Sequence, residues 1–88
     1  MEPVENILWM ADALTQRVKL CQENGERPKD MVDLRVAATD LRLMASSVAI
    51  NLPPSRDRRF VTVIRRQAIR AENYARRQLA GTSALDVA

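Results

Sequence analysis

Apolar residues recur every three or four positions along most of this chain, and no stretch alternates apolar and polar residues as a half-buried strand does. Two clusters of turn-forming residues interrupt the pattern, at Asn24–Pro28 and at Leu52–Ser55. The pattern therefore predicts an all-α domain over residues 1–80, with helices at 3–23, 31–51 and 57–80. Residues 81–88 lack the helical period, and we expect them to form a frayed C-terminal tail.

Residues with known preferences for helix ends support these boundaries. Pro3 suits the first turn of a helix, and Gly25 suits the left-handed conformation that ends one. Asp30 and Ser55 are good N-caps for the second and third helices. Gly81 is the expected stop of the third helix.

The second helix carries two apolar stripes, whereas its neighbours carry one main stripe each. The first helix is expected to bury Val4, Ile7, Met10, Ala11, Leu14, Val18 and Cys21. The second has a main stripe of Leu34, Ala38, Leu41, Ala45, Val48 and Leu52 and a narrower one of Val32, Val36, Leu43 and Ile50. The third is expected to bury Phe60, Ile64, Ala68, Ala71, Ala75 and Leu79. A helix with two apolar faces needs neighbours on both, so we expect the second helix to be central.

Loops this short favour antiparallel neighbours, either as an up-down-up bundle or as a long helical hairpin with an extra N-terminal helix. Three helices of this size cannot cover every apolar residue. The expected surplus is Trp9, Leu20, Val36, Leu43 and Ile69. It predicts a homo-oligomer or contact with a protein partner.

Charge is divided unevenly along the 88 residues, whose net charge is +3. Residues 56–77 hold eight arginines against Asp57 and Glu72, a net charge of +6. Residues 1–55 have eight acidic and six basic residues. The guanidinium group pairs in bidentate fashion with carboxylate or phosphate, so the third helix is predicted to meet an anionic partner.

Helical spacing separates these arginines into two lines. Arg59, Arg66, Arg70 and Arg77 lie within about 40° of one another and extend over roughly 27 Å. Arg58, Arg65 and Arg76 form a second line. One interpretation is a solvated face whose arginines pair with Asp33, Asp40 and the acids of the first helix. The other, which we favour, is a surface that binds an external anion or an acidic protein, because like charges so close together repel.

The residue types present argue against catalysis and against metal or cofactor binding. The chain has no histidine, no glycine-rich phosphate loop and one cysteine, Cys21, which falls on an apolar stripe. We therefore expect no enzyme activity, no metal and no cofactor. We also expect a cytoplasmic protein of a bacterial host cell, since no signal peptide or membrane-spanning run is evident.

The C-terminal half carries a resemblance to a known family. The segment PSRDRRFVTVIR at 54–65, Ala71 and the segment ARRQL at 75–79 resemble the second half of a phage helical-hairpin family. Arg59-Phe60, Val63, Ala71 and Arg77 are the matching positions. The family resembles phage counter-defence sponges, which sequester cyclic oligonucleotide signals in helical oligomers. The match covers about 30 residues and implies no ligand contacts in this chain, because the long first helix with Trp9 departs from the family.

These observations lead to one leading hypothesis and two alternatives. The leading hypothesis is a non-enzymatic phage counter-defence protein, like an anti-CRISPR protein or a signal sponge. It would inhibit a host system by binding an acidic protein surface or a phosphate-bearing ligand, with a protein target slightly favoured. The first alternative is a small nucleic-acid-binding or regulatory helical module. The second is a structural oligomer whose arginines pair across its own interface.

Overall fold

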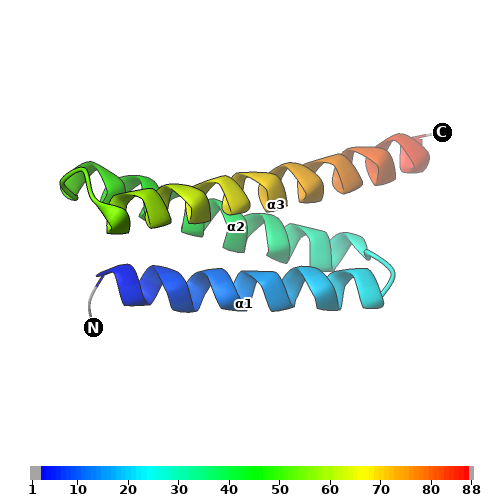
Figure 1. The fold of residues 1–88 in the computed structure, drawn as a ribbon. Coiled ribbons are helices and arrows are strands. Elements are labelled where there is room, and N and C mark those ends of the chain that lie inside the picture. Colours follow the sequence, from blue (N-terminus) through cyan, green and yellow to red (C-terminus); the bar gives the residue numbers. More distant parts are fainter. Residues whose placement is uncertain (1–2, 88) are drawn as a thin grey trace.

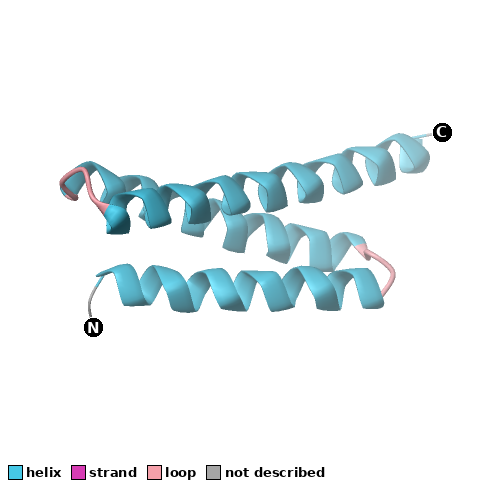
Figure 2. Ribbon diagram, in the orientation of Figure 1, coloured by secondary structure: helices cyan, strands magenta, loops and turns pink. Residues whose placement is uncertain are grey.

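The computed structural model describes residues 3–87 of the chain and the side chains of residues 3–81. It contains α1 (Pro3–Glu23), α2 (Pro28–Asn51) and α3 (Arg56–Val87), joined by two short loops (Figures 1 and 2). No strand occurs among the described residues. The prediction of an all-α, three-helix fold is confirmed.

The helices run up, down and up, so that α1 and α3 are parallel and α2 is antiparallel to both (Figure 1). The bundle is elongated, 50 × 20 × 16 Å. α2 contacts both neighbours, as expected of the central helix, and its contact with α3 is much the larger. α1 completes the bundle by packing against both α2 and α3.

The core is a continuous cluster of apolar side chains from all three helices. It consists of Ile7, Leu14, Cys21, Met31, Leu34, Ala38, Leu41, Ala45, Val61, Ile64, Ala68 and Ala75. Two pairs of alanines spaced seven apart, on α2 and on α3, are fully buried. Small side chains allow the two helix backbones to approach closely, which explains why the α2–α3 contact dominates.

The buried line of α3 begins one residue later than predicted. Phe60 was expected to be buried, yet it is 46% exposed, whereas its neighbour Val61 is 0% exposed. α3 packs chiefly against α2, so the side of α3 that faces α2 sets the core line. Phe60 lies about 100° around the helix from Val61, away from that contact.

The second apolar stripe of α2 does not pack inside the bundle. Val32, Val36, Leu43 and Ile50 are all exposed. The expectation that both stripes would touch neighbouring helices is therefore wrong. One broad stripe serves both contacts, because α1 and α3 lie on the same side of α2.

The first loop ends α1 in a Schellman motif, as the glycine predicted. Gly25 has φ 83°, Glu26 donates its N–H to the carbonyl of Cys21 at 2.8 Å, and Gly25 donates to that of Gln22 at 3.3 Å. Glu26 also has a positive φ, 56°. The Tyr74 hydroxyl donates a hydrogen bond to the Glu26 carboxylate, which ties this strained residue to α3.

Two of the predicted helix boundaries need correction. α2 begins at Pro28, which suits the first helical position, and Arg27 is its N-cap. Asp30 therefore lies inside the first turn, where its carboxylate accepts a hydrogen bond from Arg27 Nε at 3.0 Å. α3 continues past Gly81 to Val87, because Gly81 does not adopt the positive φ that ends a helix. Residue 88 of the predicted tail lies outside the described residues.

Ser55 caps α3 as predicted, and the helix begins at Arg56, one residue before the predicted start. The side-chain Oγ of Ser55 accepts a hydrogen bond from the backbone N–H of Arg58 at 3.3 Å. This contact satisfies one of the free N–H groups at the helix start. It also fixes where α3 begins.

Removing the Tyr74 hydroxyl should weaken the anchor between α3 and the first loop. Burial, and next the hydrogen bond to Glu26, raise the pKa of Tyr74 to about 12. Because the pKa of Tyr74 is higher in the folded protein, the neutral phenol adds to the free energy of unfolding. This contribution is complete below pH 10.0, the pKa of the unfolded chain, and is lost as the pH rises through about 12. We expect Tyr74→Phe to cost about 1 kcal/mol at neutral pH and to remove this alkaline loss.

The chain has one tyrosine, so its absorbance near 295 nm reports this titration directly. The native protein should ionise near pH 12, and the urea-unfolded chain near pH 10. Coincident titrations of the two states would contradict the Glu26 anchor.

Candidate functional site

The side of α3 that faces away from the core carries four arginines. Arg59, Arg66, Arg70 and Arg77 are all exposed. With Val61, Ile64, Ala68 and Ala75 facing the bundle, residues phased roughly 180° away point into solvent. We call these four arginines the arginine face.

The arginine face has no anionic partner within the part of the chain whose side chains are described. The two ion pairs there, Arg27–Asp30 and Arg42–Glu72, both involve other residues. The alternative in which the arginines pair with Asp33 and Asp40 is therefore not seen within one chain. Because α3 holds four like charges on a rigid surface, their mutual repulsion is left uncompensated.

The second line of arginines lies nearer α2 and is partly engaged. Arg65 Nε donates a hydrogen bond to Ser46 Oγ on α2 at 2.8 Å. The Arg76 guanidinium donates to the side-chain oxygen of Asn73. The side chain of Arg58 makes no such bond, and only its backbone groups bond to Ser55 and Thr62. The two predicted lines thus differ in how many guanidinium N–H groups remain available to a partner. Two arginines of the second line already donate hydrogen bonds within the chain.

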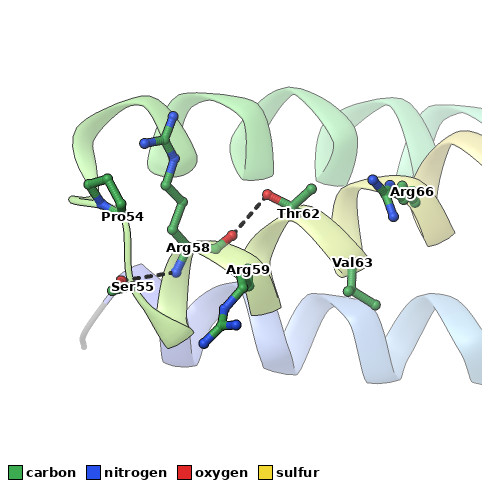
Figure 3. Close-up of a pocket in the computed structure, with 7 residues that line it drawn as sticks. All are labelled: Pro54, Ser55, Arg58, Arg59, Thr62, Val63 and Arg66. Atoms are coloured by element: carbon green, nitrogen blue, oxygen red, sulfur yellow. Dashed lines mark hydrogen bonds between the residues drawn. The ribbon is translucent and has the colours of Figure 1, made fainter.

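An open hollow of about 690 Å³ lies along the first three turns of α3. Its lining residues are Pro54, Ser55, Arg58, Arg59, Thr62, Val63 and Arg66. Figure 3 shows the Arg58 and Arg59 side chains pointing in opposite directions from α3, with Val63 on the same side as Arg59. Three arginines and the apolar Pro54 and Val63 therefore border the hollow, but the Arg58 and Arg59 guanidinium groups lie on opposite sides of α3.

The five apolar residues predicted as surplus do not form one surface. Trp9 is 71% exposed and Leu20 is also exposed, both on α1. Val36 and Leu43 are exposed on α2, while Ile69 on α3 is half-buried. None of the five lines the hollow at the start of α3.

Two residues beside the arginine face were not predicted as binding residues. Val63 and Phe60 are both nearly half exposed, close to Arg59 and Arg66 in sequence. The sequence pattern assigns Phe60 to the core instead. The position of Val63, four residues after Arg59 and three before Arg66, was the signal that could have placed it on this face.

One polar network crosses the α2–α3 contact. The Glu72 carboxylate accepts hydrogen bonds from Thr39 Oγ1 at 2.7 Å and from Arg42 Nε at 3.0 Å. The hydrogen bond from Thr39, and then that from Arg42, lower the pKa of Glu72, while burial opposes them. Each group in the network is paired, which is typical of a structural contact.

The described residues also bear on three other kinds of site. They contain no group of three His, Cys, Asp or Glu residues arranged to hold a metal ion. None of their helices is long and apolar enough to cross a membrane. Cys21 lies in the core, where burial raises the pKa of its thiol and so disfavours the reactive thiolate.

Comparison with known protein families, with curated proteins and with solved structures finds no match for this chain. A functional proposal therefore rests on the geometry of the arginine face and on the surfaces beside it.

Proposed function

We propose that this protein is a non-enzymatic binding protein that docks on an acidic protein surface through the arginine face. The observation that carries the proposal is that four exposed arginines on one rigid helix have no anionic partner among the described side chains. An acidic partner would relieve their repulsion and accept bidentate hydrogen bonds from them.

The apolar neighbours of the arginines favour a protein partner. Val63 and Phe60 are partly exposed beside Arg59, and Val63 also lines the hollow at the start of α3. Arginine and aromatic residues are enriched in protein interfaces, where apolar contacts at the centre supply much of the affinity. A ligand bound through phosphate alone would gain nothing from these apolar contacts.

A phosphate-bearing ligand or a nucleic acid is the second candidate. It is favoured by the three arginines, Arg58, Arg59 and Arg66, that line one hollow. Single-strand binders also stack bases on several aromatic side chains. Only Phe60 is available for that on the described part of α3, because Tyr74 is half-buried and bonded to Glu26.

The role in phage counter-defence stays a prediction that follows from the sequence resemblance. In that role, the docked helix would inhibit a host defence system by covering an acidic surface that the system needs. The absence of catalytic activity likewise stays a prediction.

Removing two charges from the arginine face should weaken binding to an acidic, partly apolar peptide. We expect Arg66→Gln with Arg70→Gln to raise the dissociation constant about tenfold, because each lost ion pair contributes up to about 1 kcal/mol. The measurement is the fluorescence anisotropy of a labelled peptide that alternates glutamate and leucine.

A matched variant removes the same charge elsewhere. Arg17→Gln with Lys19→Gln changes two exposed residues of α1 and should alter the dissociation constant by less than about twofold. An equal loss in both variants would show that net charge, not the arginine face, drives binding. Single-stranded or duplex DNA that binds more tightly than the peptide, with steep salt dependence, would favour the second candidate instead.

A further inference from the structure

A second unpaired surface runs along α2, on the side opposite its buried stripe and bordered by α3. Val32, Val36, Leu43 and Ile50 are exposed there, Ile50 at 78%. At 100° per residue these four side chains lie within about 40° of one another, along roughly 27 Å of helix. Single exposed apolar residues are ordinary, but a continuous line of four marks a contact surface. We call this line the α2 seam.

The spacing of the α2 seam is that of a coiled coil. Val36, Leu43 and Ile50 recur every seven residues and take the a positions of a heptad. Val32, four residues before Val36, then takes a d position, while the later d positions are polar Thr39 and Ser46. The a line therefore carries most of the apolar contact.

The surface of α2 already contains a hole of the kind that receives a coiled-coil side chain. Such a hole is formed by residues i, i+3, i+4 and i+7 of one helix. Val32, Arg35, Val36 and Thr39 have this spacing, and all four line a hollow of about 330 Å³. Asp40 and Leu79 complete its lining.

Charges on the two sides of the α2 seam define which way a second α2 helix would run. Arg35 occupies a g position and Asp40 the e position five residues later, and both are exposed without an ion pair among the described side chains. In a parallel pair, g of one helix meets the following e of the other, so Arg35 meets Asp40 twice. In an antiparallel pair, Arg35 would face the side that carries Arg35 and Arg42, and Asp40 the side that carries Asp33 and Asp40.

We propose that a second copy of this chain occupies the α2 seam, forming a parallel two-fold dimer through α2. Val36 of each copy enters the hole of the other, and Arg35 of each copy pairs with Asp40 of the other. The proposal does not depend on the proposed function, because the arginine face lies on a different helix.

Sedimentation equilibrium tests the dimer. At about 100 µM the wild-type protein should sediment at twice the chain mass of 10.0 kDa. Leu43→Glu should sediment as a monomer with unchanged helical circular dichroism, because Leu43 packs against nothing in the core. Leu20→Glu, a matched change on exposed α1, should remain a dimer. A monomeric wild-type protein, or dissociation by Leu20→Glu alone, would overturn the proposal.

Charge exchange and cross-linking test the direction of the two helices. Arg35→Glu and Asp40→Arg should each weaken the dimer about fivefold, and the double variant should restore it. Ile50→Cys should form a disulfide between copies on mild oxidation, while the wild-type protein, whose Cys21 is buried, should not. A dimer strengthened by Arg35→Glu, or one that Ile50→Cys does not cross-link, would be antiparallel and would overturn the proposal.

Discussion

Leu41→Ala is expected to lower the free energy of unfolding by about 3–5 kcal/mol, the range typical of truncating a large aliphatic side chain in a well-packed core. Leu41 is 1% exposed and lies where the three helices meet. It lines a small cavity of about 110 Å³ with residues of α1 and α3, including Leu14, Thr15 and Ala71. Truncating Leu41 would enlarge this cavity and remove contacts with both neighbours.

The loss is large relative to the total stability, which is roughly 4–13 kcal/mol for a domain of this size. Urea unfolding followed by circular dichroism, at one fixed protein concentration, is the appropriate measurement. Leu20→Ala is the matched control, because Leu20 is 56% exposed and its truncation should cost less than about 0.5 kcal/mol. If Leu41→Ala unfolds the chain, Leu41→Met should still fold, with a loss below about 1.5 kcal/mol. Equal losses in the two alanine variants would contradict the packing described for Leu41.

Glu72→Gln is expected to cost about 2 kcal/mol at neutral pH. The amide keeps the shape of the side chain and an acceptor for Thr39, but it removes the charge that pairs with Arg42. The side chains of Glu72 and Arg42 are 15% and 32% exposed, so the uncompensated guanidinium is poorly hydrated. Losing the Glu72–Arg42 ion pair should weaken the α2–α3 contact, which is the largest in the bundle.

The same carboxylate makes stability depend on pH. The pKa of Glu72 is lowered from 4.5, chiefly by the Thr39 hydrogen bond. Its contribution is therefore complete above pH 4.5 and is lost as the pH falls through the lower, folded-state pKa. Urea unfolding between neutral and acid pH should show the wild-type protein and Glu72→Gln converging in acid. Glu23→Ala, which removes an exposed glutamate of α1 outside this network, is the matched control. A wild-type profile that parallels that of Glu72→Gln throughout would exclude this role for Glu72.

Turn residues and capping residues were each right at one helix end and wrong at another: Gly25 and Ser55 act as predicted, whereas Asp30 and Gly81 do not. The first helix has the predicted ends at Pro3 and Glu23, because Gly25 adopts the positive φ that its type favours. Asp30 was a misleading cap, since Pro28 is better suited to the first helical turn and starts α2 earlier. Gly81 is also compatible with a helix, and its presence alone did not end α3.

The arginine face shows which features of a site can be predicted from helical spacing alone. The positions of Arg59, Arg66, Arg70 and Arg77 determine that they share one side of a helix, whatever that helix packs against. Whether Asp33 or Asp40 neutralises them depends on distances between helices. The fold leaves both aspartates exposed on α2, without an ion pair to any described arginine of α3.

The sequence by itself determined the number and order of the helices, the main core stripes of α1 and α2, and the arginine face. These features follow from local periodicity and from backbone preferences within a few residues. Tertiary structure alone decided that Val61 rather than Phe60 is buried and that one stripe of α2 serves both neighbours. It also decided that Val32 and Ile50 are exposed beside Val36 and Leu43, which the sequence had already marked as surplus. Those outcomes depend on how closely the alanines of α2 and α3 allow the helices to approach, and the contact between helices is not a property of either helix alone.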